Sequence, residues 1–99
     1  MVVIISRYIK SLEVIDALGV EHRKFLDECY KKSLFICSGP QIPRVGGLLM
    51  ARVDTVEEAR EIMKNDPFTI HEAAEYQYVK FSPTKYDDRF SCFVKTVRQ

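Results

Sequence analysis

Four short runs of apolar residues predict the strands of this protein. The first run is VVIISRY (residues 2–8), and LFICS (34–38), LLMARV (48–53) and YQYVKFS (76–82) follow along the chain. β-Branched and aromatic residues dominate these runs, as is typical of strands. The sequence therefore predicts four strands, with longer connections after the first and the third.

The connection after the first strand has the periodicity of an amphipathic helix. Ser11 can cap this helix, and Glu13 in its first turn has a charge that suits the helix dipole. One face is formed by residues at steps of three and four, namely Ile15, Leu18, His22, Phe25 and Cys29. Gly19 weakens or bends the helix, so the segment is compatible with two short helices as well as with one.

The connection after the third strand predicts a second helical segment. It begins with a capping-box pattern, because Glu58 follows Thr55 at a distance of three residues. Its inward stripe consists of Val56, Ala59, Met63 and Asp66. Pro67 then stops the helix or starts a new turn. The order β-α-β-β-α-β is typical of a ferredoxin-like α+β sandwich, in which the helices cover one face of a four-stranded antiparallel sheet.

The predicted strands are apolar at consecutive positions. Residues 2–5, 34–37 and 48–51 are all apolar, whereas a strand with one face in water alternates apolar and polar residues. Both faces of the central strands are therefore expected to be buried. Two short helices cannot cover both faces of one sheet, and cyclic dimers are the commonest oligomers. We therefore predict a homodimer that packs sheet against sheet.

Composition restricts the classes of function. The 99 residues suffice for one domain, and 15 Lys and Arg against 14 Asp and Glu give a net charge of +1. This balance disfavours a general nucleic-acid binder. An RNA-recognition sheet has the same topology, but its third strand displays aromatic residues, and residues 48–53 contain none. We therefore expect no nucleic-acid partner.

The N-terminus and the cysteines indicate a cytoplasmic protein. The apolar stretch in residues 1–7 is too short for a signal peptide or a membrane span. Cys29, Cys37 and Cys92 are odd in number and widely spaced, which disfavours a disulfide framework or a cysteine metal site. Because Cys29 and Cys37 have apolar neighbours, we expect both thiols to be core residues.

His22 and Asp66 are the most informative polar positions, because each lies on an inward apolar stripe. In the predicted fold the two helices lie side by side, so the two side chains can meet. A carboxylate beside an imidazole fixes the ring tautomer and favours the charged ring, as a general acid or base near neutral pH requires. The structural alternatives are a core histidine with satisfied hydrogen bonds and an aspartate that caps backbone N–H groups before Pro67.

Further candidate residues lie in the connection after the second strand. Ser38 can offer a hydroxyl to a ligand, Gly39 allows close approach of the backbone, and Pro40 makes the turn rigid. Arg44 is a candidate for holding an anionic group. The alternatives are an ordinary turn and a solvated arginine. Phe68 is either a core residue or the apolar wall of a pocket beside the His–Asp pair.

Other polar and aromatic residues carry weaker signals. His71 and Glu75 are four apart, but no third residue has metal-ligand spacing, so both are expected to be exposed polar residues. Tyr76 and Tyr78 share one strand face and are expected to pack.

The C-terminal residues fit the βαββαβ pattern least well. Residues 83–88 have the composition of a loop, whereas residues 90–97 have that of a strand. This segment is compatible with an extended sheet edge and with an arm that reaches the partner subunit.

Several short motifs together resemble the YCII-related proteins. They are Glu21-His22-Arg23 with Phe25-Leu26, Ser38-Gly39-Pro40, Pro43, Gly46-Gly47, Asp66-Pro67-Phe68 and Phe81-Ser82-Pro83. The resemblance covers residues 2–85 of the single domain 1–99, and residues 86–99 form a C-terminal extension. It implies a dimeric α/β-barrel assembly, in which two ferredoxin-like sheets face each other.

The resemblance also implies an active site around a His and an Asp, which match His22 and Asp66. Family members resemble small cofactor-free enzymes, some of which act on chlorinated or hydroxylated aromatic compounds. One hypothesis is therefore a lyase- or isomerase-like enzyme, similar to a dehydrochlorinase. It would transfer a proton on a small cyclic or aromatic acid-type substrate without a metal or organic cofactor. The alternative is a non-catalytic dimeric module that binds a small ligand or assists other enzymes.

Overall fold

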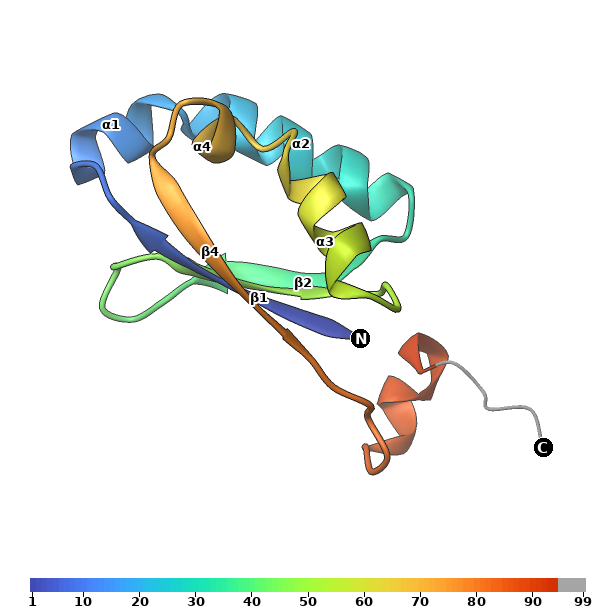
Figure 1. Ribbon diagram of the computed structural model, residues 1–99. Coiled ribbons are helices and arrows are strands. Elements are labelled where there is room, and N and C mark those ends of the chain that lie inside the picture. The colour runs from blue at the N-terminus through green and yellow to red at the C-terminus, as the bar shows by residue number, and fades with distance from the viewer. Residues whose placement is uncertain (95–99) are drawn as a thin grey trace.

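A computed structural model describes residues 1–94 of the chain. The strands are β1 (Val2–Tyr8), β2 (Phe35–Pro40), β3 (Gly47–Ala51) and β4 (Ala74–Lys80). The helices are α1 (Leu12–Ala17), α2 (Gly19–Lys31), α3 (Val56–Met63), α4 (Pro67–Ile70) and the 3₁₀ helix η1 (Asp88–Phe93). All strand pairs are antiparallel in the order β2-β3-β1-β4, and α1 to α4 lie on one side of the sheet (Figure 1). The predicted ferredoxin-like α+β fold is confirmed.

The helices differ in detail from the predicted segments. The first segment forms two helices, which meet at Leu18 just before Gly19. The second predicted helix was expected to reach Asp66, but α3 already ends at Met63. Asp66 has an extended backbone and is the N-cap of the separate helix α4, with Pro67 in its first turn. Proline is favoured at this position because the first helical N–H has no partner within the helix.

The core lies between the sheet and the helices. Along β1 the residues Val2, Ile4 and Ser6 are buried, whereas the residues between them are only half-buried. The main core cluster joins β1 and the neighbouring strands to Cys29 of α2 and Met63 of α3. Burial of Cys29 is as predicted, and desolvation in this core raises the pKa of its thiol.

A β-bulge in β2 reverses the pattern of side chains along that strand. Phe35 pairs with Ala51 and Cys37 with Met50, so Ile36 is the extra residue. The bulge places Cys37 on the sheet face away from the helices, where its side chain is exposed. The prediction that Cys37 is a core residue is therefore wrong for the single chain. The same shift places Ser38 opposite the buried Leu49, on the helix side.

The C-terminal residues up to Val94 project from the end of β4 (Figure 1). The strand composition of residues 90–97 is not realised within the described part, because Asp88–Phe93 forms η1; residues 95–97 lie outside the described residues. Asp87 caps this helix and accepts hydrogen bonds from the Arg89 side chain and backbone, which lower the pKa of Asp87 to about 2. Within residues 1–94, no helix is long and apolar enough to cross a membrane.

Candidate active site

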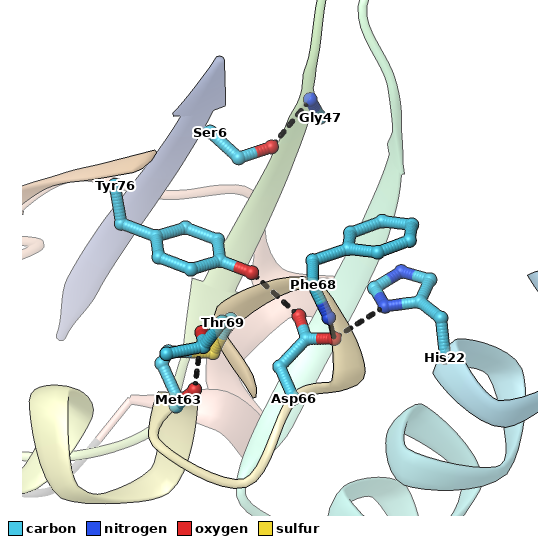
Figure 2. A network of polar contacts seen from close by, with 8 residues as sticks. All are labelled: Ser6, His22, Gly47, Met63, Asp66, Phe68, Thr69 and Tyr76. Atoms are coloured by element: carbon cyan, nitrogen blue, oxygen red, sulfur yellow. Dashed lines mark hydrogen bonds and ion pairs between the residues drawn. The ribbon is translucent and has the colours of Figure 1, made fainter. Parts of the chain in front are cut away.

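Asp66 is the most deeply buried polar group of the chain's described part. Its side chain has no exposed surface. Oδ1 accepts the Phe68 N–H at 3.0 Å and lies 2.9 Å from Nδ1 of His22, while Oδ2 accepts the Tyr76 hydroxyl at 2.7 Å (Figure 2). A buried carboxylate needs such partners to offset its lost hydration. Asp66 therefore caps α4, as the structural alternative predicted, and it also meets His22, as the spacing of the two residues predicted.

His22 projects from the second turn of α2 toward Asp66 and is about one-fifth exposed. Because an ionised carboxylate can only accept hydrogen bonds, Nδ1 must carry a proton. In the neutral ring this leaves Nε2 as the unprotonated nitrogen. The ring also stacks on Phe68, with centroids 4.0 Å apart and planes 12° apart. Contacts with Asp66 and Phe68 therefore fix both the tautomer and the plane of the imidazole.

Tyr76 completes this network, although the sequence predicted only a packing role for it. Burial, with Asp66 nearby as the second cause, raises the pKa of the Tyr76 hydroxyl above its usual range. The phenol therefore stays protonated and donates to Asp66 throughout the neutral range. In the sheet Tyr76 pairs with Ser6 of β1. Ser6 interrupts an otherwise apolar run, and this was the signal in the sequence for a polar site at that end of the sheet.

A cavity of about 300 Å³ opens beside this network, between α1, α2 and the sheet. All seven predicted site residues contribute to its wall, namely His22, Ser38, Gly39, Pro40, Arg44, Asp66 and Phe68. The Ser38 hydroxyl lies 2.7 Å from the Tyr30 hydroxyl. A side chain at Gly39 would meet no atom within 4 Å, so the backbone at Gly39 is accessible from open space.

Ser6 and the Gly46-Gly47 pair form the sheet side of the site. The Gly47 N–H donates to Ser6 Oγ at 2.7 Å. A Cβ at Gly46 would lie 1.8 Å from the Ser6 carbonyl oxygen, so only glycine fits there. No glycine within the described residues has a positive φ, so a left-handed backbone is not what requires glycine at position 46. Close backbone packing is the reason for glycine at this position.

Arg44 lies at the cavity wall but already has a partner. Its guanidinium forms an ion pair with Asp16 of α1, and this hydrogen bond is the main cause that raises the pKa of Arg44. The charge that Arg44 was expected to offer an anion is therefore compensated by a carboxylate.

The other candidate metal ligands do not form a site. Glu75 pairs with Arg7, and His71 is the C-cap of α4. Within residues 1–94, no group of three or more His, Cys, Asp and Glu side chains could hold a metal ion.

The fold and this site define a ferredoxin-like domain with a His–Asp contact in the wall of a small cavity. Residues 1–82 match the YCII-related domain, and the chain belongs to that family, which confirms the resemblance noted from the sequence. Among solved structures, the chain is similar to 5-chloro-2-hydroxyhydroquinone dehydrochlorinase from Burkholderia phenoliruptrix, determined in complex with 2,5-dihydroxybenzoquinone. The two are 20% identical with a TM-score of 0.67, over 82% of this chain and 93% of that chain. No curated protein matches the chain.

Proposed function

We propose that this protein is a small-molecule enzyme in which His22 transfers a proton and Asp66 orients and stabilises the imidazole. The observation that carries the proposal is the 2.9 Å contact between Nδ1 of His22 and Oδ1 of Asp66, in the wall of an open cavity. The substrate class is a small cyclic or aromatic compound of acid type, and the reaction is an elimination or an isomerisation. The substrate class of the structurally similar dehydrochlorinase supports this choice.

In the proposed mechanism Nε2 carries out the chemical step, because Nδ1 is hydrogen-bonded to Asp66. In an elimination, Nε2 takes a proton from the substrate and the leaving group departs with its electron pair, so that the net loss is HX. In an isomerisation, Nε2 returns the proton to another atom of the same substrate. Asp66 stabilises the imidazolium formed in either case. Ser38, Gly39, Pro40, Arg44 and Phe68 shape the cavity, and proton transfer of this kind requires no cofactor.

Turnover of halogenated hydroquinones tests the proposal. The wild-type protein is incubated in D₂O with 5-chloro-2-hydroxyhydroquinone and with unchlorinated hydroxyquinols, and chloride release and deuterium exchange are followed by NMR. His22→Gln is expected to lower either rate by about 10²–10⁴-fold. His71→Gln is the matched control, since these two are the histidines of the chain.

The outcomes separate the two candidate functions. Equal rates for wild type and His22→Gln would refute proton transfer by His22. A wild-type protein that is stabilised by these compounds in thermal-shift assays, yet shows neither chloride release nor exchange, would be the non-catalytic binding module instead.

We also propose that two copies associate through the sheet face opposite the helices. On this face Leu48 and Val79 are 40% and 44% exposed, and the apolar Val3, Ile5 and Met50 lie around them. In the single chain this face is only half-buried, which supports the homodimer predicted from the consecutive apolar positions. An exposed apolar patch on one face of a sheet is typical of an interface between subunits.

Light scattering tests the dimer. Wild type is expected at twice the mass of one chain at micromolar concentration, and Met50→Glu at the mass of one chain, because the carboxylate would be buried between the two sheets. Val20→Glu introduces the same charge at an exposed residue on the helix side and is expected to remain dimeric. A monomeric wild type would contradict the proposal.

A further inference from the structure

The charged side chains around the cavity do not balance. Besides His22, four charged residues line it, namely Asp16, Arg23, Arg44 and Asp66. Asp16 pairs with Arg44, and Asp66 is occupied by the network of His22, Tyr76 and the Phe68 N–H. Arg23 forms no ion pair or hydrogen bond within residues 1–94. Arg23 is thus the uncompensated cation of the cavity wall.

The position of this guanidinium depends on Gly19, four residues earlier on α2. A Cβ at Gly19 would lie 3.1 Å from Nη1 and 3.8 Å from Cζ of Arg23. The guanidinium therefore lies back over the first turn of α2, in the space that a side chain at position 19 would occupy. Gly19 and Arg23 both line the cavity that His22 and Asp66 share.

We propose that Arg23 binds the negative charge of a small, cyclic, singly anionic ligand in this cavity. This inference rests on the proposed function and specifies its substrate class. An arginine fork matches the two oxygens of a carboxylate. The anion on Arg23 would complete the charge balance of the wall and leave the ring beside Nε2 of His22. Arg23 follows His22 directly in sequence, but it was absent from the site predicted from sequence.

The cavity is large enough for a ligand with one ring and small substituents. A cavity of about 150 Å³ accommodates benzene in a protein interior, and this cavity has about 300 Å³. One six-membered ring with a carboxylate and small polar substituents therefore fits this volume.

A matched pair of probes tests the charge. Benzoate and benzamide have nearly the same shape, and only benzoate is anionic. Binding to full-length protein is measured by NMR titration, with millimolar affinities expected for such small probes. Wild type is expected to prefer benzoate, and Arg23→Gln to weaken benzoate binding by about tenfold while leaving benzamide binding unchanged.

Two further variants test whether the preference for benzoate depends on Arg23 in particular. Lys24→Gln removes an exposed charge from the adjacent position outside the cavity and is expected to leave benzoate binding unchanged. Arg44→Gln removes the compensated cation of the same wall and is expected to reduce the benzoate preference less than Arg23→Gln does. The proposal would be overturned if wild type bound the two probes equally, or if it bound no benzoate up to about 20 mM. It would also be overturned if Arg23→Gln had no effect on benzoate binding, or if Arg44→Gln had the larger effect.

The same variants separate this inference from the catalytic proposal. If Arg23-dependent benzoate binding is found while His22→Gln changes no reaction rate, the anion site stands and proton transfer by His22 fails. If turnover depends on His22 but neither turnover nor benzoate binding depends on Arg23, the enzyme stands and the anion site fails.

Discussion

Replacement of Asp66 by alanine is expected to destabilise the fold strongly, because one side chain satisfies three groups. Asp66→Ala leaves the Phe68 N–H and the Tyr76 hydroxyl without their acceptor, at about 1–3 kcal/mol for each buried group. The bond from the Phe68 N–H is also the N-cap interaction of α4, so the loss of the cap is included in this figure. His22 is partly exposed, so water can replace part of its contact. The expected loss is about 2–6 kcal/mol, a large part of the stability of about 5–15 kcal/mol typical of a small domain.

Asp66→Asn separates the hydrogen bonds from the charge. Asparagine caps a helix about as well as aspartate. Its carbonyl can accept from Phe68 and His22, and its amide can donate to the Tyr76 hydroxyl oxygen once that hydroxyl has turned. Replacement of a buried charge by a neutral isostere is often nearly neutral for stability. We therefore expect Asp66→Asn to cost about 1 kcal/mol in stability, while removing the charge that stabilises an imidazolium.

Urea denaturation followed by circular dichroism measures these differences at pH 7. The midpoint is expected to fall strongly for Asp66→Ala and slightly for Asp66→Asn, with similar m values if the denatured states are alike. Asp27→Ala, at an exposed position on α2, is the control and is expected within about 0.5 kcal/mol of wild type. A loss below about 1 kcal/mol for Asp66→Ala would refute the network as a stabilising element. If Asp66→Asn lost as much stability as Asp66→Ala, the charge of Asp66 rather than its hydrogen bonds would stabilise the fold, and the reasoning would be refuted.

Three further predictions concern the surroundings of the site. Tyr76→Phe is expected to cost about 1.5–3 kcal/mol at pH 7. The folded-state pKa of Tyr76 lies above its ordinary value of 10.0, so the contribution of its hydroxyl to the free energy of unfolding is fully present below pH 10.0 and decreases above it. In urea denaturation at pH 8–11, the stabilities of wild type and variant should therefore converge above pH 10.0. A constant difference in stability would contradict this. Gly46→Ala places a methyl group 1.8 Å from the Ser6 carbonyl oxygen and is expected to lower the melting temperature by several degrees or prevent folding, whereas Gly39→Ala, with no atom within 4 Å, should fold normally. Thr55→Ala removes the hydroxyl that accepts the Glu58 N–H at 3.1 Å and is expected to cost about 1 kcal/mol by urea denaturation; an unchanged midpoint would show that the cap contributes nothing.

Much of the fold follows from local pattern. The apolar run of residues 2–8 matches β1 in full, and the Ser11 and Thr55 caps accept the N–H groups expected of them. The periodicity of the first helical segment also placed His22 on the inward side. These features depend on residues close together in the chain, so their spacing is sufficient to predict them.

The site required contacts between segments far apart in the chain. Tyr76 was expected to pack, and its hydrogen bond to Asp66 depends on how β4 aligns with β1. Arg23 was not singled out, because two properties of the folded cavity distinguish it: it has no ion pair within residues 1–94, and Gly19 leaves space for its guanidinium. The spacing of residues along the chain does not predict which charged side chains pair with one another in the folded cavity.

The sequence by itself determined the order of strands and helices, the inward positions of His22 and Asp66 and the family. The tertiary structure decided which side chains face the cavity. The bulge at Ile36 shows the reason most clearly, since one extra residue in β2 moves Cys37 to the outer face and Ser38 to the helix side. A bulge is set by how two strands pair, and the free energy of that pairing depends on both strands and on the core beneath them.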